Sequence, residues 1–169
     1  NRPVTDTLLR AAEYGLFRVH WSQPILEETT RNLVKRTKMT EAQAARLQDA
    51  LSNAFPEAMV SVPSRLIEQM TNAESDRHVA AAAVIAHAQV IVTFNLKHFR
   101  AEDLDVWNLE AQHPDVFLTH LFDLDPNLLL QIIQEQAGAL TDVTVPSLLD
   151  KLEPHVPGFV IQIRSLLPE

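Results

Sequence analysis

Short apolar runs alternate with segments of helical apolar spacing through the first 122 residues. Leu8, Leu9 and Ala12 follow the spacing of a helix face, whereas the run Val-Ile-Val-Thr-Phe at 90–94 is typical of a buried strand. Helices alternating with short strands predict an α/β domain with a parallel sheet flanked by helices. The pattern predicts helices over 5–14, 22–34, 40–54, 64–70, 76–87 and 114–122, and strands over 17–21, 58–62, 90–94 and 106–110.

The pattern changes after Asp125, where strand signals stop. Apolar residues at helical spacing predict three further helices, over 128–133, 145–152 and 159–167. We therefore divide the chain into an α/β domain over 1–122 and an all-helical C-terminal extension over 123–169.

The chain opens on a helix, although an α/β unit normally opens on a strand. We expect a strand before Asn1 in the complete protein. A parallel sheet without that strand would leave backbone donors and acceptors unpaired, so we expect a second copy or a partner segment to fill any true gap.

The composition excludes some kinds of binding site and some classes of protein. Cysteine is absent, which excludes disulfides and thiolate metal sites. The formal net charge is −8, which argues against a basic nucleic-acid-binding module but is compatible with a nuclease whose carboxylates bind a cation. No apolar run is long enough for a membrane span and no signal peptide is recognised, so we expect a cytoplasmic protein without membrane contact.

Polar side chains that could form a site occur at three positions, each after a predicted strand or at the start of a predicted helix. They are Glu27 and Glu28, Asp76, and Thr93 with Asn95. Each alone has an ordinary explanation. Glutamates near a helix start offset the macrodipole, an aspartate there is a common N-cap, and threonine and asparagine often end a strand in a turn.

Together these places indicate a site, because all three map to the carboxyl edge of the predicted sheet, where α/β proteins bind ligands. Converging carboxylate and amide oxygens favour Mg²⁺ or Mn²⁺, which take oxygen ligands and retain waters. Such an ion activates water and offsets the charge of a phosphodiester.

Several short motifs follow one another along the chain: Trp21-Ser22, Ile25-Leu26-Glu27-Glu28, Arg31-Asn32-Leu33, Asp76-Arg77-His78-Val79, Ile91-Val92-Thr93-Phe94-Asn95-Leu96 with Phe99, and Pro114-Asp115-Val116-Phe117-Leu118. Their order and spacing resemble the PIN domain, over about Val4 to Leu121. The similarity is to the branch with "TFNL…F" and "HPD-x-FL" signatures, and the C-terminal extension resembles the one carried by some VapC-type toxins.

This resemblance implies a Mg²⁺- or Mn²⁺-dependent endoribonuclease with an acidic site. The implied catalytic and metal-binding residues are Glu28, with Glu27 as a less favoured neighbour, Asp76 and Asn95. His98 stands where many relatives have another acid. Asp103 and Asp105 are candidates to supply that acid instead. The first catalytic aspartate of the family would precede Asn1.

The resemblance also implies partners: an RNA substrate, a cognate antitoxin protein and a second copy of the chain in a homodimer. Two functions remain open from the sequence. The first is a ribonuclease that hydrolyses RNA phosphodiesters, as the toxin of a toxin–antitoxin pair. The second is a catalytically defective PIN-like module that serves protein interaction.

Overall fold

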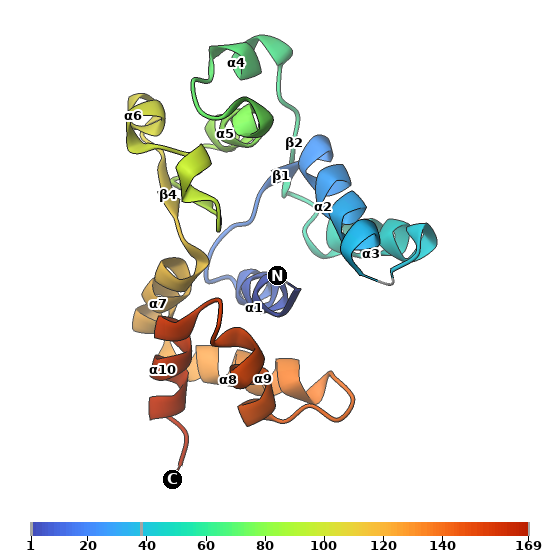
Figure 1. Ribbon diagram of the computed structural model, residues 1–169, viewed down its shortest axis with the longest axis vertical. Helices are drawn as coiled ribbons and strands as arrows, with labels where there is room; N and C mark the ends of the chain where they lie inside the picture. Colours follow the sequence, from blue (N-terminus) through green and yellow to red (C-terminus); the bar gives the residue numbers. More distant parts are fainter. Residues whose placement is uncertain (1, 38, 169) are drawn as a thin grey trace. The chain divides into compact units, whose positions relative to one another are not determined.

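The computed structural model describes residues 2–37 and 39–168 (Figure 1). Helices dominate, and the strands are short. The α-helices are α1 Arg2–Glu13, α2 Gln23–Arg36, α3 Glu41–Ala54, α4 Ser64–Gln69, α5 Arg77–Ile85, α6 Ala101–Leu104, α7 Pro114–Leu124, α8 Pro126–Gly138, α9 Val145–Leu152 and α10 Pro157–Ser165. The strands are β1 Trp21–Ser22, β2 Met59–Val60, β3 Val90–Val92 and β4 Glu110–Gln112, and the 3₁₀ helices are η1 Glu74–Asp76, η2 Leu96–His98 and η3 Asp105–Trp107.

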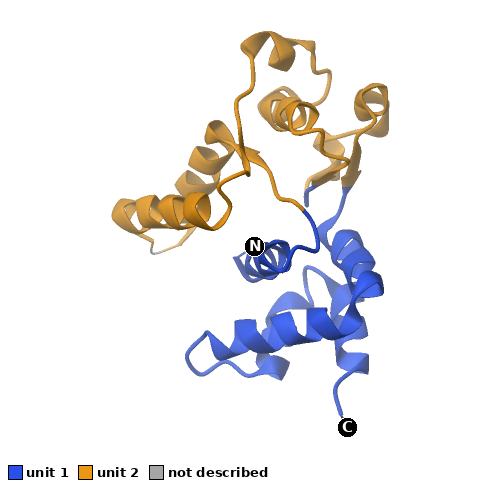
Figure 2. Cartoon of the chain, turned by 180° about the vertical axis from the view of Figure 1, so that it is seen from behind, with its two compact units in different colours: residues 1–17, 92–94, 112–169 blue, residues 18–91, 95–111 orange. Residues whose placement is uncertain are grey.

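The chain forms two compact units that do not follow the predicted boundary at 122 (Figure 2). The N-terminal helix α1 and helix α7, both assigned to the α/β domain from the sequence, belong to the helical unit instead. Unit 1 comprises Asn1–Phe17, Val92–Phe94 and Gln112–Glu169, and unit 2 comprises Arg18–Ile91 and Asn95–Ala111.

Unit 2 contains a parallel strand pair and the alanine-rich helix α5. Trp21 pairs with Met59 and Ser22 with Val60 in the β1–β2 ladder. Alanines 80–83 are all buried, and their small side chains allow neighbouring elements to pack closely against the helix. A capping box joins Thr40 and Gln43 at the start of α3, with both reciprocal hydrogen bonds formed.

The second strand pair, β3–β4, corrects one strand prediction. Glu110 N–H donates to Gln89 O and Thr93 N–H to Gln112 O, so the partner numbers rise together and the strands are parallel. The strand predicted over 106–110 is wrong. Residues 105–107 form η3, where Val106 is 76% exposed, and Asn108 adopts a left-handed turn at φ 54° before β4 begins.

The single predicted sheet is therefore two separate two-stranded pairs, β1–β2 and β3–β4, within the part of the chain that is described. The α/β architecture with short parallel strands and a helical C-terminal region is confirmed. Strands β2 and β3 are shorter than predicted, and β1 overlaps the strand predicted over 17–21 only at Trp21.

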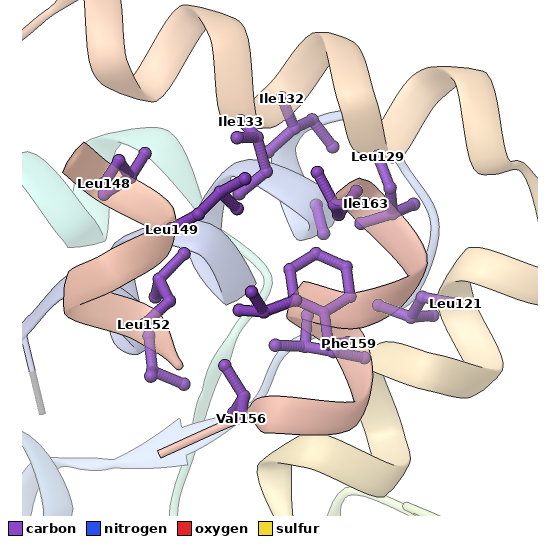
Figure 3. Close-up of a cluster of buried hydrophobic side chains, with 14 of the residues drawn as sticks. Leu121, Leu129, Ile132, Ile133, Leu148, Leu149, Leu152, Val156, Phe159 and Ile163 are labelled. Carbon is purple, nitrogen blue, oxygen red and sulfur yellow. The ribbon is translucent and has the colours of Figure 1, made fainter. Parts of the chain in front are cut away.

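Unit 1 is a helical bundle around one hydrophobic core (Figure 3). Phe159 and Ile163 of α10 are fully buried among side chains of α8 and α9. Helix α1 belongs to the same core through Val4 and Ala11, and Gly15 ends the helix with φ 79°, a left-handed conformation that suits glycine. Tertiary packing rather than local sequence thus assigns α1 to this unit.

Taken singly, no helix in residues 2–37 and 39–168 combines the length and hydrophobicity of a membrane span. Helices α7 and α8 reach that threshold only when counted together, and they meet at a bend of 120°.

Asp115, near the start of α7, links that helix to the start of α10. Its Oδ2 accepts the backbone N–H of Gly158 at 3.0 Å, and its Oδ1 accepts that of Phe159 at 2.8 Å. These backbone N–H groups lie in the first turn of α10 and have no acceptor within the helix. A carboxylate there also offsets the helix dipole. A side chain at Gly158 would meet the same carboxylate at 3.0 Å, which explains the glycine.

We expect Asp115→Ala to lower the free energy of unfolding by about 1–3 kcal/mol, because two backbone donors lose their acceptor. Urea denaturation followed by circular dichroism measures this change. Asp123→Ala, in the last turn of the same helix, is the matched control. Equal stability of the two variants would contradict the role assigned to Asp115.

Candidate active site

Two of the predicted site residues converge on one histidine within unit 2. Asp76 ends η1 and Asn95 follows β3, so the two are distant in sequence. His98 Nδ1 lies 2.6 Å from Asp76 Oδ2 and 2.7 Å from Asn95 Nδ2. Ser75 Oγ also donates to Asp76 Oδ2 at 2.9 Å. The η2 turn therefore gathers an acid, an amide and an imidazole at one point.

The chemistry of this contact constrains the proton on His98. A carboxylate only accepts hydrogen bonds, so Nδ1 carries a proton when it pairs with Asp76. Asn95 can then offer its amide oxygen to the same edge of the ring, since the oxygen and nitrogen of an amide can exchange places by a flip. His98 thus holds Asp76 and Asn95 together.

Asp76 is at the N-cap position of α5, but its side chain forms no capping hydrogen bond. The ordinary explanation for this residue, a helix cap, is therefore wrong. Its carboxylate points to Ser75 and His98 instead, and the side chain is 23% exposed. An acid that is not used to cap its helix and remains partly open to solvent is available for ligand chemistry.

Glu28 contacts α5 rather than the Asp76–His98 pair. Its Oε2 lies 3.3 Å from Nε2 of His78, two residues beyond Asp76 in the sequence. Glu28 is in the second turn of α2, and the first turn contains no acid, so compensation of the macrodipole does not explain it. Half of the Glu28 side chain is exposed, which leaves a second carboxylate oxygen accessible.

Glu27 belongs to a different surface. Gln23 Nε2 donates to Glu27 Oε1 at 3.0 Å along α2. The residue also lines an open groove of about 560 Å³ between α2 and α3. The structure thus separates the two neighbours, with Glu28 directed to α5 and Glu27 to α3.

Asp103 has a partner set of its own. Its Oδ1 accepts from Thr71 Oγ1 at 2.7 Å, and its Oδ2 accepts from Arg100 Nε at 3.0 Å. The hydrogen bond from Thr71, followed by that from Arg100, lowers the pKa of the Asp103 carboxyl below its ordinary value. Asp103 is therefore engaged in a structural pair, and Asp105 is exposed at the start of η3.

The donor types at this site suit a divalent cation. The carboxylates of Glu28 and Asp76 and the amide oxygen of Asn95 are ligands that Mg²⁺ and Mn²⁺ take, and Mg²⁺ commonly binds through one or two carboxylates while keeping waters. Across the described ranges, however, no three histidines, aspartates or glutamates form a group suited to a metal. The donor types alone therefore leave metal binding by these residues as a proposal.

Two contact residues have no role assigned from the sequence. His78 pairs with Glu28, and Ser75 donates to Asp76. Both flank Asp76 within two positions, which is the only sequence signal they give. The contact of His78 with Glu28 depends on the packing of α2 against α5, a tertiary arrangement that local patterns do not encode.

Comparison with known proteins identifies both parts of the chain. A family model described as "PIN domain" matches residues 2–97, and one described as "VapC50 C-terminal domain" matches residues 114–165. A protein of Mycobacterium tuberculosis named "Putative ribonuclease VapC50" is 44% identical over 105 residues, which cover 61% of this chain and 62% of that protein. No solved structure matches.

The chain thus aligns with less than two thirds of that relative's length. The PIN-domain model nevertheless covers more than half of the chain, in the region that holds Glu28, Asp76 and Asn95. The chain therefore belongs to the PIN-domain family and carries a C-terminal domain of the VapC50 type.

Proposed function

We propose that this protein is the toxin ribonuclease of a toxin–antitoxin pair and that it hydrolyses RNA phosphodiesters with the help of Mg²⁺ or Mn²⁺. The observation that carries the proposal is the meeting of Asp76 and Asn95 at His98 Nδ1. Membership of the PIN family and similarity to a protein named as a ribonuclease support the same reaction. The proposed partners are RNA and a cognate antitoxin protein.

Glu28, Asp76 and Asn95 are the residues that would hold the ion. A bound divalent cation lowers the pKa of a coordinated water and offsets the negative charge of the phosphodiester. The chain supplies no cysteine nucleophile for an alternative, covalent route. Hydrolysis by an activated water is the reaction that carboxylate and amide donors favour.

The neighbouring side chains act as positioning residues in this proposal. His98 and Ser75 donate to the same Asp76 oxygen, Oδ2, which leaves Oδ1 as the oxygen directed to a ligand. His78 restrains Glu28 through one carboxylate oxygen in the same manner. Contacts of this kind orient metal-binding carboxylates and reduce the freedom lost on binding.

We expect RNA cleavage by the purified protein to stop in excess EDTA and to return when Mg²⁺ or Mn²⁺ is added in excess of the chelator. The substrate is an end-labelled single-stranded RNA, and the products are separated on a denaturing gel. Added NaCl of equal ionic strength is the control for a salt effect. Equal cleavage with and without EDTA would refute metal dependence.

A second candidate function is a PIN-like interaction module without catalysis. It is favoured by one observation: His98 already pairs with the Asp76 carboxylate that would otherwise bind a cation. The same experiment separates the two functions. An interaction module would cleave no RNA under any metal condition while still binding its protein partner.

A further inference from the structure

Three aromatic rings meet in unit 1 where β3 ends. The ring of Phe94 lies 5.1 Å from that of His113 and 6.2 Å from that of His155, centroid to centroid, and both contacts are edge-on. Phe94 is 44% exposed, His113 is half-buried and His155 is exposed. The three residues come from the segment just after β3, the N-cap of α7 and the segment before α10.

The His113-Pro114-Asp115 motif holds these rings in place. His113 Nδ1 accepts the backbone N–H of Asp115 at 3.2 Å, so the ring is fixed as the N-cap of α7, and a neutral ring carries its proton on Nε2. Asp115 in turn accepts the backbone N–H groups of Gly158 and Phe159, close after His155. The His113-Pro114-Asp115 motif thus supplies the His113 ring and also fixes the segment that carries His155.

We propose that Phe94, His113 and His155, here called the ring cluster, form a stacking site for an unpaired nucleobase of the RNA. This inference rests on the proposed ribonuclease function, since it concerns how that substrate is held. The peptide bond joins Phe94 directly to Asn95. The ring cluster thus adjoins the candidate active-site residue Asn95 in the sequence.

The chemistry of the ring cluster favours a nucleobase as the occupant. Unpaired bases stack on phenyl and imidazole rings, and this stacking depends little on the identity of the base. The chain has a net charge of −8, which weakens the overall electrostatic attraction that a basic surface would give for the phosphates. Stacking is a source of affinity that does not need such a surface.

The test compares RNA binding by wild-type protein and by Phe94→Ala. Fluorescence anisotropy is measured in EDTA with a labelled single-stranded 12-nucleotide RNA and with a tetrahydrofuran–phosphate oligomer that has the same charge but no bases. We expect Phe94→Ala to weaken RNA binding about 5- to 150-fold, the range typical of one lost stacked base, and to leave binding of the abasic oligomer unchanged.

Two further variants serve as a rescue and a control for this test. Phe94→Trp restores an aromatic face and should retain RNA binding. Val116→Ala removes another exposed apolar side chain of the same unit, 46% exposed on α7, and should bind like the wild type. Circular dichroism verifies that each variant is folded.

Equal RNA binding by wild type and Phe94→Ala would overturn the stacking site, as would an equal loss with the abasic oligomer. Neither result affects the proposed ribonuclease, which is judged by cleavage. Conversely, a protein that binds RNA through Phe94 but never cleaves it would contradict the proposed function and leave the stacking site in place.

Discussion

We expect Asp76→Asn to cleave RNA about 100-fold more slowly than the wild type, or slower still. The substitution keeps the shape of the side chain but removes the negative charge that would bind a cation. Loss of metal-assisted charge stabilisation is worth several kcal/mol at the transition state, and each 1.4 kcal/mol is about a factor of ten in rate. Initial cleavage rates at saturating Mg²⁺ or Mn²⁺ measure the effect.

Glu74→Gln is the matched control, because it removes one charge from an exposed residue of the same 3₁₀ helix. We expect its cleavage rate to stay within a factor of three or so of the wild type, since surface substitutions usually have small effects. Asp76→Asn should also remain folded, because Asp76 does not cap α5. Similar rates for Asp76→Asn and Glu74→Gln would remove Asp76 from the active site.

The largest expected loss of stability is that of Phe159→Ala, at about 3–5 kcal/mol. Phe159 is fully buried at the centre of the unit 1 core, among side chains of α8, α9 and α10. Removal of the ring leaves a cavity in addition to the lost burial. Since small proteins are stable by only about 5–15 kcal/mol, this variant should be partly unfolded under mild denaturation.

Two optical signals separate the units in this experiment. Both tryptophans, Trp21 and Trp107, are in unit 2, so fluorescence follows that unit, whereas far-ultraviolet circular dichroism follows helices throughout. We expect the circular dichroism midpoint in urea to fall for Phe159→Ala. Ile161→Ala, on the same helix but 63% exposed, should keep the wild-type midpoint. Equal midpoints for both variants would contradict the position of Phe159 in the core.

The sequence predicts most helices because periodicity and caps are local. The capping box at Thr40 and the glycine after α1 illustrate this, since each depends only on residues a few positions away. The strand predicted over 106–110 fails for the same reason. Val106, Trp107 and Leu109 are apolar and favour a strand, but the left-handed turn at Asn108 and the exposure of Val106 depend on tertiary structure.

For the candidate site too, some features can be predicted from the local sequence and others depend on the tertiary structure. Asp76 and Asn95 stand out in the sequence because polar residues at a strand end or helix start are conspicuous. Their shared contact with His98 is visible only in three dimensions. The pairing of Glu28 with His78 depends on the side chains that two packed helices present to each other, and a linear pattern does not specify that geometry. The functional roles of these residues stay predictions until the variants are measured.

Helix α1 has a consequence for synthesis of the protein on the ribosome. Thr7 Oγ1 is hydrogen-bonded to Gln136 Oε1 at 2.7 Å across 129 residues of sequence, and Val4 and Ala11 share a core with the last three helices. Translation proceeds at about 5–20 residues per second, so roughly 6–26 s pass between the synthesis of α1 and that of these partners. Its apolar face stays without this core during that interval.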